Sequence, residues 1–130
     1  MAKTQAKYVD GFVFAVPKNK VAAYKKMAGE GAAIWKKFGA LDYKECMGDD
    51  LKIKKVAGMP SPISFTNLTN AKSSETVWFS FITFKNKAHR DQVNKKVMAY
   101  FSKKYADSAD QSMPFNPARM AYGGFSVVVS

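Results

Sequence analysis

Residues Thr76–Phe84 read Thr-Val-Trp-Phe-Ser-Phe-Ile-Thr-Phe, the stretch that gives the strongest strand signal in the chain. Aromatic and β-branched residues, which favour strands, fill both of its alternating faces. Tyr8–Val16 has the same character and is followed by Pro17. A strand that is apolar on both faces belongs inside a sheet that is covered on both sides. The sequence therefore predicts two central strands, one early and one late in the chain.

Two further segments repeat their apolar residues with the period of a helix. The first runs from about Asn19 to Phe38, and the second covers Lys87–Tyr105, with Asn86 as its N-cap. The apolar stripes consist of Val21, Tyr24, Met27, Ala28, Gly31, Ile34, Trp35 and Phe38 in the first, and of Val93, Val97, Phe101 and Tyr105, with Met98 beside them, in the second.

The remaining strands are weaker signals. Leu41–Met47 carries several charges, which suits an edge strand. Met120–Val129 is the last predicted strand, and Gly123-Gly124 within it predicts a bulge or a close backbone approach.

Irregular segments separate these elements. Residues 49–75 are predicted to form a long loop with a short extended piece around Ile63–Leu68, and loops of this length often lie over a site or an interface. Residues 1–6 are expected to form a flexible tail, and Ala106–Pro117 a polar turn.

The order β-α-β, long loop, β-α-β predicts an α+β fold in one domain over residues 1–130. It is the ferredoxin-like βαββαβ arrangement, a four-stranded antiparallel sheet with strands in the order fourth, first, third, second and both helices on one face. This order makes the two strands that are apolar on both faces central. The order of the elements and the apolar character of the two strands therefore agree on which strands are central.

The open face of such a sheet predicts a homodimer. Two helices cover only one face, and we assign Tyr8, Phe12 and Phe14 to the other, together with their partners on the third strand. Exposed, they would form an apolar patch larger than monomers usually carry. A second copy packed sheet to sheet would bury it.

Charge is the most conspicuous feature of the composition. The 130 residues carry a formal net charge of +11, yet 19 of the 21 basic residues are lysines, dispersed in pairs, and only Arg90 and Arg119 are arginines. Arginine is preferred for reading bases and phosphates, so a solvated lysine surface is the favoured interpretation. Binding to nucleic acid stays open as the alternative.

The cysteine count and the apolar segments indicate where in the cell the protein is expected. The single cysteine, Cys46, excludes an intrachain disulfide, and Met1–Lys7 lacks the apolar region of a signal peptide. Phe12–Val16, the longest apolar run, is too short to span a membrane. We expect a cytoplasmic protein without membrane contact.

Two residues are candidates for catalysis. His89 could act as a general base, or it could cap or pack locally in the first turn of its helix. Asp10 interrupts an apolar strand, so it is either hydrogen-bonded inside the structure, with Arg90 or Arg119 as partner, or held in a cavity. The topology places both at the same end of the domain.

As ligand-binding candidates we take Tyr8, Asp10, Glu45, Arg90 and Arg119. Glu45 and Cys46 alternate on their strand, so only one can face a given side, and Cys46 is expected to be a small buried side chain. One histidine and one cysteine leave too few ligands for a metal site, and no cofactor is implied.

Several segments closely resemble the YbaA-like family of uncharacterised bacterial proteins. They are Tyr8–Phe12, Val16-Pro17, Gly39–Leu41, Glu45-Cys46, Gly48–Asp50, Glu75–Val77, Ala88–Asp91, Val93-Asn94, Lys96–Met98, Met113–Phe115 and Tyr122–Phe125.

The resemblance implies a dimeric α/β-barrel, in which two ferredoxin-like sheets close around a shared interior, and no established reaction. Related barrels include cofactor-free monooxygenases, haem-binding enzymes and isomerases, and the fold does not choose among them. The leading hypothesis is a cytoplasmic homodimer that holds a small ligand in each sheet cavity. An RNA-associated protein using its lysine surface and a cofactor-free monooxygenase-like enzyme are the alternatives.

Overall fold

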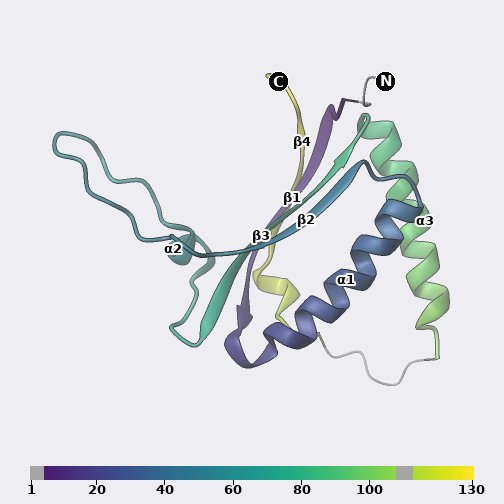
Figure 1. Cartoon of the computed structure of the whole chain (residues 1–130), viewed down its shortest axis with the longest axis horizontal. Coiled ribbons are helices and arrows are strands. Elements are labelled where there is room, and N and C mark those ends of the chain that lie inside the picture. The colour runs from purple at the N-terminus through teal and green to yellow at the C-terminus, as the bar shows by residue number, and fades with distance from the viewer. Residues whose placement is uncertain (1–4, 108–112) are drawn as a thin grey trace.

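A four-stranded sheet with its two long helices on one side organises the computed structural model, which describes residues 5–107 and 113–130 (Figure 1). Its elements are β1 (Tyr8–Pro17), the 3₁₀ turn η1 (Lys18–Lys20), α1 (Val21–Lys37), β2 (Asp42–Met47), α2 (Phe65–Thr69), β3 (Glu75–Phe84), α3 (Lys87–Lys104), the 3₁₀ turn η2 (Pro117–Arg119) and β4 (Ala121–Ser126).

The four strands form one antiparallel sheet in the order β2-β3-β1-β4. This is the predicted strand order, and it makes β1 and β3 central and the charged β2 an edge strand. The α+β class and the four-stranded antiparallel sheet are therefore confirmed, in an arrangement consistent with the ferredoxin-like topology.

Helices α1 and α3 lie on one side of the sheet, as Figure 1 shows. The hydrophobic core between these helices and the sheet forms two clusters. One is centred on Phe84, Val93 and Val97, and the other on Phe14 and Val16. The predicted stripe of α1 is confirmed. On α3 the stripe through Val93, Val97 and Phe101 is confirmed, but Tyr105 at its end and Met98 beside it are exposed.

The assignment of Tyr8, Phe12 and Phe14 to the open face was wrong, because all three pack into the clusters beneath the helices. Both parities of β1 are apolar, so the pattern alone could not orient the strand. Asp10 shares the side of these aromatic residues, and its hydrogen-bonding partners lie on α3. That side therefore faces the helices.

The opposite side of the sheet carries the other parity of each strand. Val9 and Val13 of β1 are partly exposed there, Phe79 of β3 is 45% exposed, and Phe125 of β4 is 62% exposed. Only one end is covered, where α2 contacts β1 and β3 and where Ala15 and Val77 are buried. Among the described residues, the rest of this face has no helix over it. We call it the open face.

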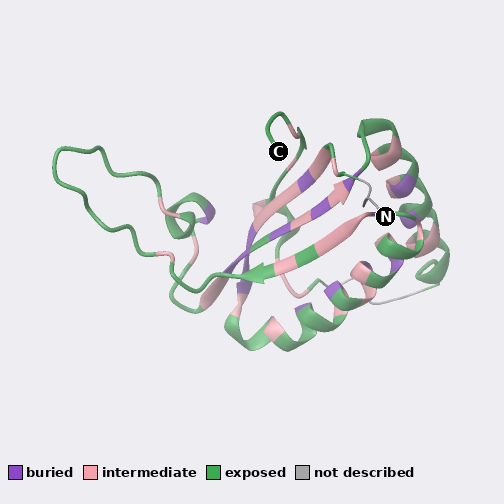
Figure 2. Ribbon diagram, turned by 45° about the horizontal axis from the view of Figure 1, so that its top comes forward, coloured by how far each residue is buried: buried purple, intermediate pink, exposed green. Residues whose placement is uncertain are grey.

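The chain between β2 and β3 projects away from the sheet as a long, exposed loop (Figures 1 and 2). It contains α2 where a short extended piece was predicted. The Ser64 hydroxyl caps this helix by accepting a 3.0 Å hydrogen bond from the Asn67 N–H, and Asn70 ends it in a left-handed conformation. Serine is a residue type that favours the N-cap position, so Ser64 is the sequence signal for the start of this helix.

Two local predictions can be compared directly. Asn86 is the N-cap of α3, since its side chain accepts a 2.8 Å hydrogen bond from the His89 N–H. Gly124 pairs regularly with Asp10, without a bulge, and a Cβ at Gly124 would lie 2.9 Å from the Tyr8 ring. The close backbone approach is therefore the correct alternative.

The predicted tail and polar turn fall partly on residues 1–4 and 108–112, which lie outside the described residues. Within the described ranges, no helix is long and apolar enough to cross a membrane.

Candidate functional site

A carboxylate held by two tyrosines lies between α1 and the edge strand β2. Tyr43 and Glu45 are two residues apart on β2, so both point to the helix side of the sheet. The Tyr24 hydroxyl, from α1, donates to the Glu45 Oε1 atom at 2.7 Å, and the Tyr43 hydroxyl donates to Oε2 at 3.0 Å. The two hydroxyls fix the position of the carboxylate.

Burial dominates the electrostatics of this group. Burial raises the pKa of Glu45, and the hydrogen bonds from Tyr24, Tyr43 and Ser80, its neighbour on β3, only partly oppose it. Burial, followed by the negative charge of Glu45, raises the pKa values of Tyr24 and Tyr43. Both phenols therefore keep their protons and serve as donors to Glu45.

The carboxylate lines a pocket of about 430 Å³ whose wall is mostly apolar. We call it the Glu45 pocket. It is lined by Val21, Lys25, Ala28, Gly29, Ala32, Tyr43, Glu45, Met47 and Trp78.

Small residues on α1 keep the Glu45 pocket open. A Cβ atom built on Gly29 meets nothing within 4 Å, so the space beside this glycine is free. On the sheet, Trp78 is buried, and its indole N–H donates to the Thr76 Oγ1 atom at 2.8 Å. The polar atom of the tryptophan is thus already used, and the pocket meets its apolar ring.

Asp10 belongs to a second cluster, which joins β1 to α3. Its side chain is 1% exposed and accepts hydrogen bonds from Arg90 Nη1 at 2.7 Å and from Asn94 Nδ2 at 3.2 Å. Asn94 in turn accepts from the Trp35 indole N–H at 2.9 Å. The Arg90 guanidinium also lies over the Tyr8 ring, 4.9 Å from its centre. Three candidates, Tyr8, Asp10 and Arg90, are therefore brought together here.

His89 takes part in the local capping of α3 and is joined by no hydrogen bond to Asp10. Its Nδ1 atom accepts a 3.0 Å hydrogen bond from the Lys85 N–H, and its ring packs edge-on against Phe84. Burial, followed by the charges of nearby lysines, lowers the pKa of the imidazole. A neutral His89 whose Nδ1 atom is already occupied stabilises the start of the helix.

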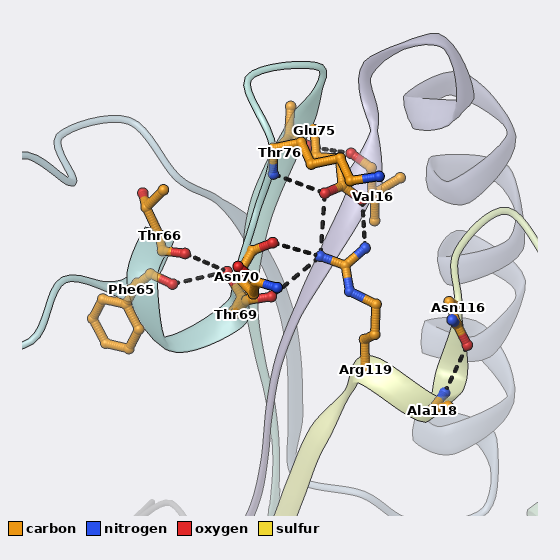
Figure 3. A network of polar contacts seen from close by, with 11 residues as sticks. Val16, Phe65, Thr66, Thr69, Asn70, Glu75, Thr76, Asn116, Ala118 and Arg119 are labelled. Carbon is orange, nitrogen blue, oxygen red and sulfur yellow. Dashed lines mark hydrogen bonds and ion pairs between the residues drawn. The ribbon is translucent and has the colours of Figure 1, made fainter.

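Arg119 lies in a third place, at the base of the long loop (Figure 3). From η2 it donates to Glu75 at 2.7 Å and to the carbonyl oxygens of Thr69 and Asn70 at 3.2 and 3.0 Å. The guanidinium therefore joins the C-terminal end of α2 to β3. Its contacts connect elements of the fold, and they include neither Asp10 nor Glu45.

Cys46 is exposed, contrary to the prediction that it is buried, because it alternates with Glu45 and so faces away from the helices. Across residues 5–107 and 113–130, no group of three His, Cys, Asp or Glu side chains lies close enough to hold a metal ion.

Sequence reasoning singled out Glu45 but missed its partners. Tyr24 was interpreted only as part of the apolar stripe of α1. Tyr43 could have been found, because a residue two positions from Glu45 on a strand must share its side. Asn94 left no comparable signal, since its contact with Asp10 depends on how α3 packs.

Comparison with known proteins places the chain in a family. The model of a family described as a protein of unknown function, DUF1428, matches residues 7–117. The chain belongs to this family. The DUF1428 match includes Asp10, Tyr24, Tyr43, Glu45 and Arg90, and so covers both the Glu45 pocket and the Asp10 cluster.

Bacterial relatives agree with this assignment. The uncharacterized protein YbaA of Escherichia coli strain K12 is 41% identical over 123 residues, which are 95% of this chain and 97% of the relative. The protein of the same name from Shigella flexneri matches to the same extent. The YbaA-like resemblance is confirmed, and DUF1428, like these relatives, carries no described activity.

Proposed function

We propose that the protein binds a small molecule in the Glu45 pocket and works as a homodimer. The observation that carries the first part is a half-buried carboxylate, fixed by Tyr24 and Tyr43, in the wall of a mostly apolar pocket. Ligand sites commonly combine an apolar lining with a few fixed polar groups. Burial of Glu45 also raises its pKa, as is common where a carboxyl group has a functional task.

The open face supports the homodimer. Val9, Val13, Phe79 and Phe125 form an apolar surface across the sheet, and a second copy packed on it by a two-fold axis would remove it from water. Two sheets joined in this way give the dimeric α/β-barrel that the family resemblance implies. A cytoplasmic location belongs to the proposal and rests on the single cysteine.

The ligand proposal is tested by screening a library of small fragments while recording amide chemical shifts of the isotope-labelled protein. We expect binders to shift the amides of Val21–Ala32 on α1 and of Tyr43–Met47 on β2. A set of binders that shift none of these amides would contradict the proposal.

Two matched variants strengthen the test. Gly29→Phe extends a ring from the position where the structure leaves free space, and it should abolish binding. Ala33→Phe places the same ring at an exposed position on α1 that does not line the pocket, and it should leave binding unchanged. Equal loss of binding in both variants would show that α1, and not the pocket, was damaged.

A further inference from the structure

The polar wall of the Glu45 pocket accepts hydrogen bonds but offers almost none. A carboxylate has about four lone-pair positions, and the hydroxyl hydrogens of Tyr24, Tyr43 and Ser80 occupy three of them, which leaves one for a ligand. The Tyr43 oxygen, having donated its hydrogen, can only accept. The Trp78 N–H is bound to Thr76. Lys25, exposed on α1, is the one remaining donor side chain among the lining residues.

Among the described residues, Glu45 also lacks a cation of the kind that pairs with several other carboxylates. Asp10 is paired with Arg90, Glu75 with Arg119 and Glu30 with Lys104. No lysine or arginine of the described residues forms such a pair with Glu45, although its carboxylate is half-buried and therefore poorly hydrated. Leaving a buried charge without a partner is costly unless something else supplies the opposite charge.

We propose that the ligand of the Glu45 pocket is a small organic cation, an amine whose ammonium group pairs with Glu45 and whose apolar body lies against Trp78. This inference rests on the ligand-binding function proposed above. An ammonium group brings three donors to a wall of acceptors. Trp78 in the pocket wall offers an apolar contact to the body of the amine. The raised pKa of Glu45 agrees, since it shows a charge that its surroundings stabilise poorly.

Two features oppose a cationic ligand, and both act weakly here. The net charge of +11 repels cations at long range, but salt at about 0.1 M screens such fields beyond roughly 10 Å. Lys25 lines the pocket, but its side chain is exposed and can extend into water. The contact with the half-buried carboxylate is short-ranged and little screened, so it decides the preference.

The test compares three compounds with the same apolar body: 2-phenylethylamine, 2-phenylethanol and 3-phenylpropionate. Dissociation constants are measured from the chemical shifts of pocket amides at pH 7. A hydrogen bond between charged groups contributes more than one to a neutral group, so we expect the amine to bind about tenfold more tightly than the alcohol. We expect the carboxylate to bind most weakly.

Two variants assign the preference to the groups named. Glu45→Gln keeps an acceptor oxygen for the tyrosines but removes the charge, so the amine and the alcohol should bind about equally. Lys25→Gln removes the opposing cation and should tighten binding of the amine alone. The second variant alters an exposed side chain, so the test holds even if Glu45→Gln fails to fold.

Each contrary outcome overturns a defined statement. An alcohol or carboxylate that binds at the pocket as tightly as the amine overturns the cationic ligand and leaves the ligand site intact. A preference for the amine that persists in Glu45→Gln overturns the role of Glu45. If none of the three compounds shifts the pocket amides, the cationic ligand is overturned. The fragment library then decides separately whether the pocket binds any ligand.

Discussion

The Asp10 carboxylate on β1 lies 2.7 Å from the Arg90 guanidinium on α3, although 80 residues separate the two in the chain. The carboxylate is 1% exposed and the side chain of Arg90 is 14% exposed, so this ion pair is almost completely removed from water. It is the main polar connection between the central strand and the second long helix.

Replacing Arg90 should therefore destabilise the fold strongly. Arg90→Met leaves Asp10 buried without its cation, and the loss of one partner of a buried pair costs about 3–5 kcal/mol. The double variant Asp10→Asn/Arg90→Met should recover much of this loss, because no charge then remains buried. Urea unfolding of the two single variants and the double variant measures the coupling. Additive effects would show that the two side chains act independently.

Glu45→Gln should change stability in a way that depends on pH. The folded pKa of Glu45 is raised above the usual 4.5, so the folded state binds this proton more tightly than the unfolded chain. The stability from this group is full below pH 4.5 and is lost as pH rises through the folded pKa.

The variant should therefore gain stability relative to the original protein as pH rises from 4 to 8. Thermal unfolding of both proteins across this range gives the comparison, and groups common to both, such as His89, cancel in the difference. A variant that loses stability relative to the original protein as pH rises would refute the burial argument.

Phe79→Lys should dissociate the proposed dimer. The ring is 45% exposed on the open face, so a lysine fits there without disturbing the core, but it would bring two charges into a sheet-to-sheet interface. Met98→Lys is the matched control, since Met98 is 52% exposed on α3. Light scattering should report a dimer for the original protein and the control, and a monomer for Phe79→Lys. A monomeric original protein at micromolar concentration would end the dimer hypothesis.

Arg119→Met should loosen the base of the long loop without unfolding the protein. The guanidinium joins Glu75 to the carbonyl oxygens of Thr69 and Asn70, so its loss frees the end of α2. Hydrogen exchange should accelerate in Phe65–Glu75 and stay unchanged in α3. Faster exchange throughout the chain would indicate a global role for Arg119 instead.

The lysine surface should show no saturable binding to RNA at about 0.15 M salt. Eight lysines are exposed on the outer faces of α1 and α3 as separated pairs, which is the solvated surface that the composition predicted. Gel mobility of a structured RNA at several salt concentrations checks this. Binding that weakens steeply with added salt would instead favour the RNA-associated alternative.

The sequence predicted the strand order because the order β-α-β, loop, β-α-β implies it. The apolar residues on both faces of β1 and β3 supported a central place for these two strands. The same property hid which face meets the helices, since neither parity of Tyr8–Val16 is polar enough to decide it. Asp10 does identify the face of β1 that meets the helices, because Arg90 and Asn94 of α3 donate hydrogen bonds to it. Such contacts between distant residues cannot be predicted from the alternation of side chains along one strand.

The candidate site, too, could be predicted from the sequence only in part. Glu45 could be chosen because a carboxyl group stands out on a strand, whereas Tyr24 has the spacing of an ordinary core residue and 21 residues separate it from Glu45. His89 and Asp10 were expected at one end of the domain. They do lie at one end, since Asp10 accepts a hydrogen bond from Arg90, the residue next to His89, but His89 itself accepts from the Lys85 N–H and forms no hydrogen bond with Asp10.

The place of β1 at the centre of the sheet has a consequence for synthesis on the ribosome. Of the four strands of the sheet, β1 is made before the others, but it pairs with β3 and with β4, which is made after them. Until β4 leaves the exit tunnel, one edge of this apolar strand has no partner, and unpaired strand edges of nascent chains promote aggregation. A strand at the centre of the finished sheet is thus the strand that must be shielded longest while the protein is being made.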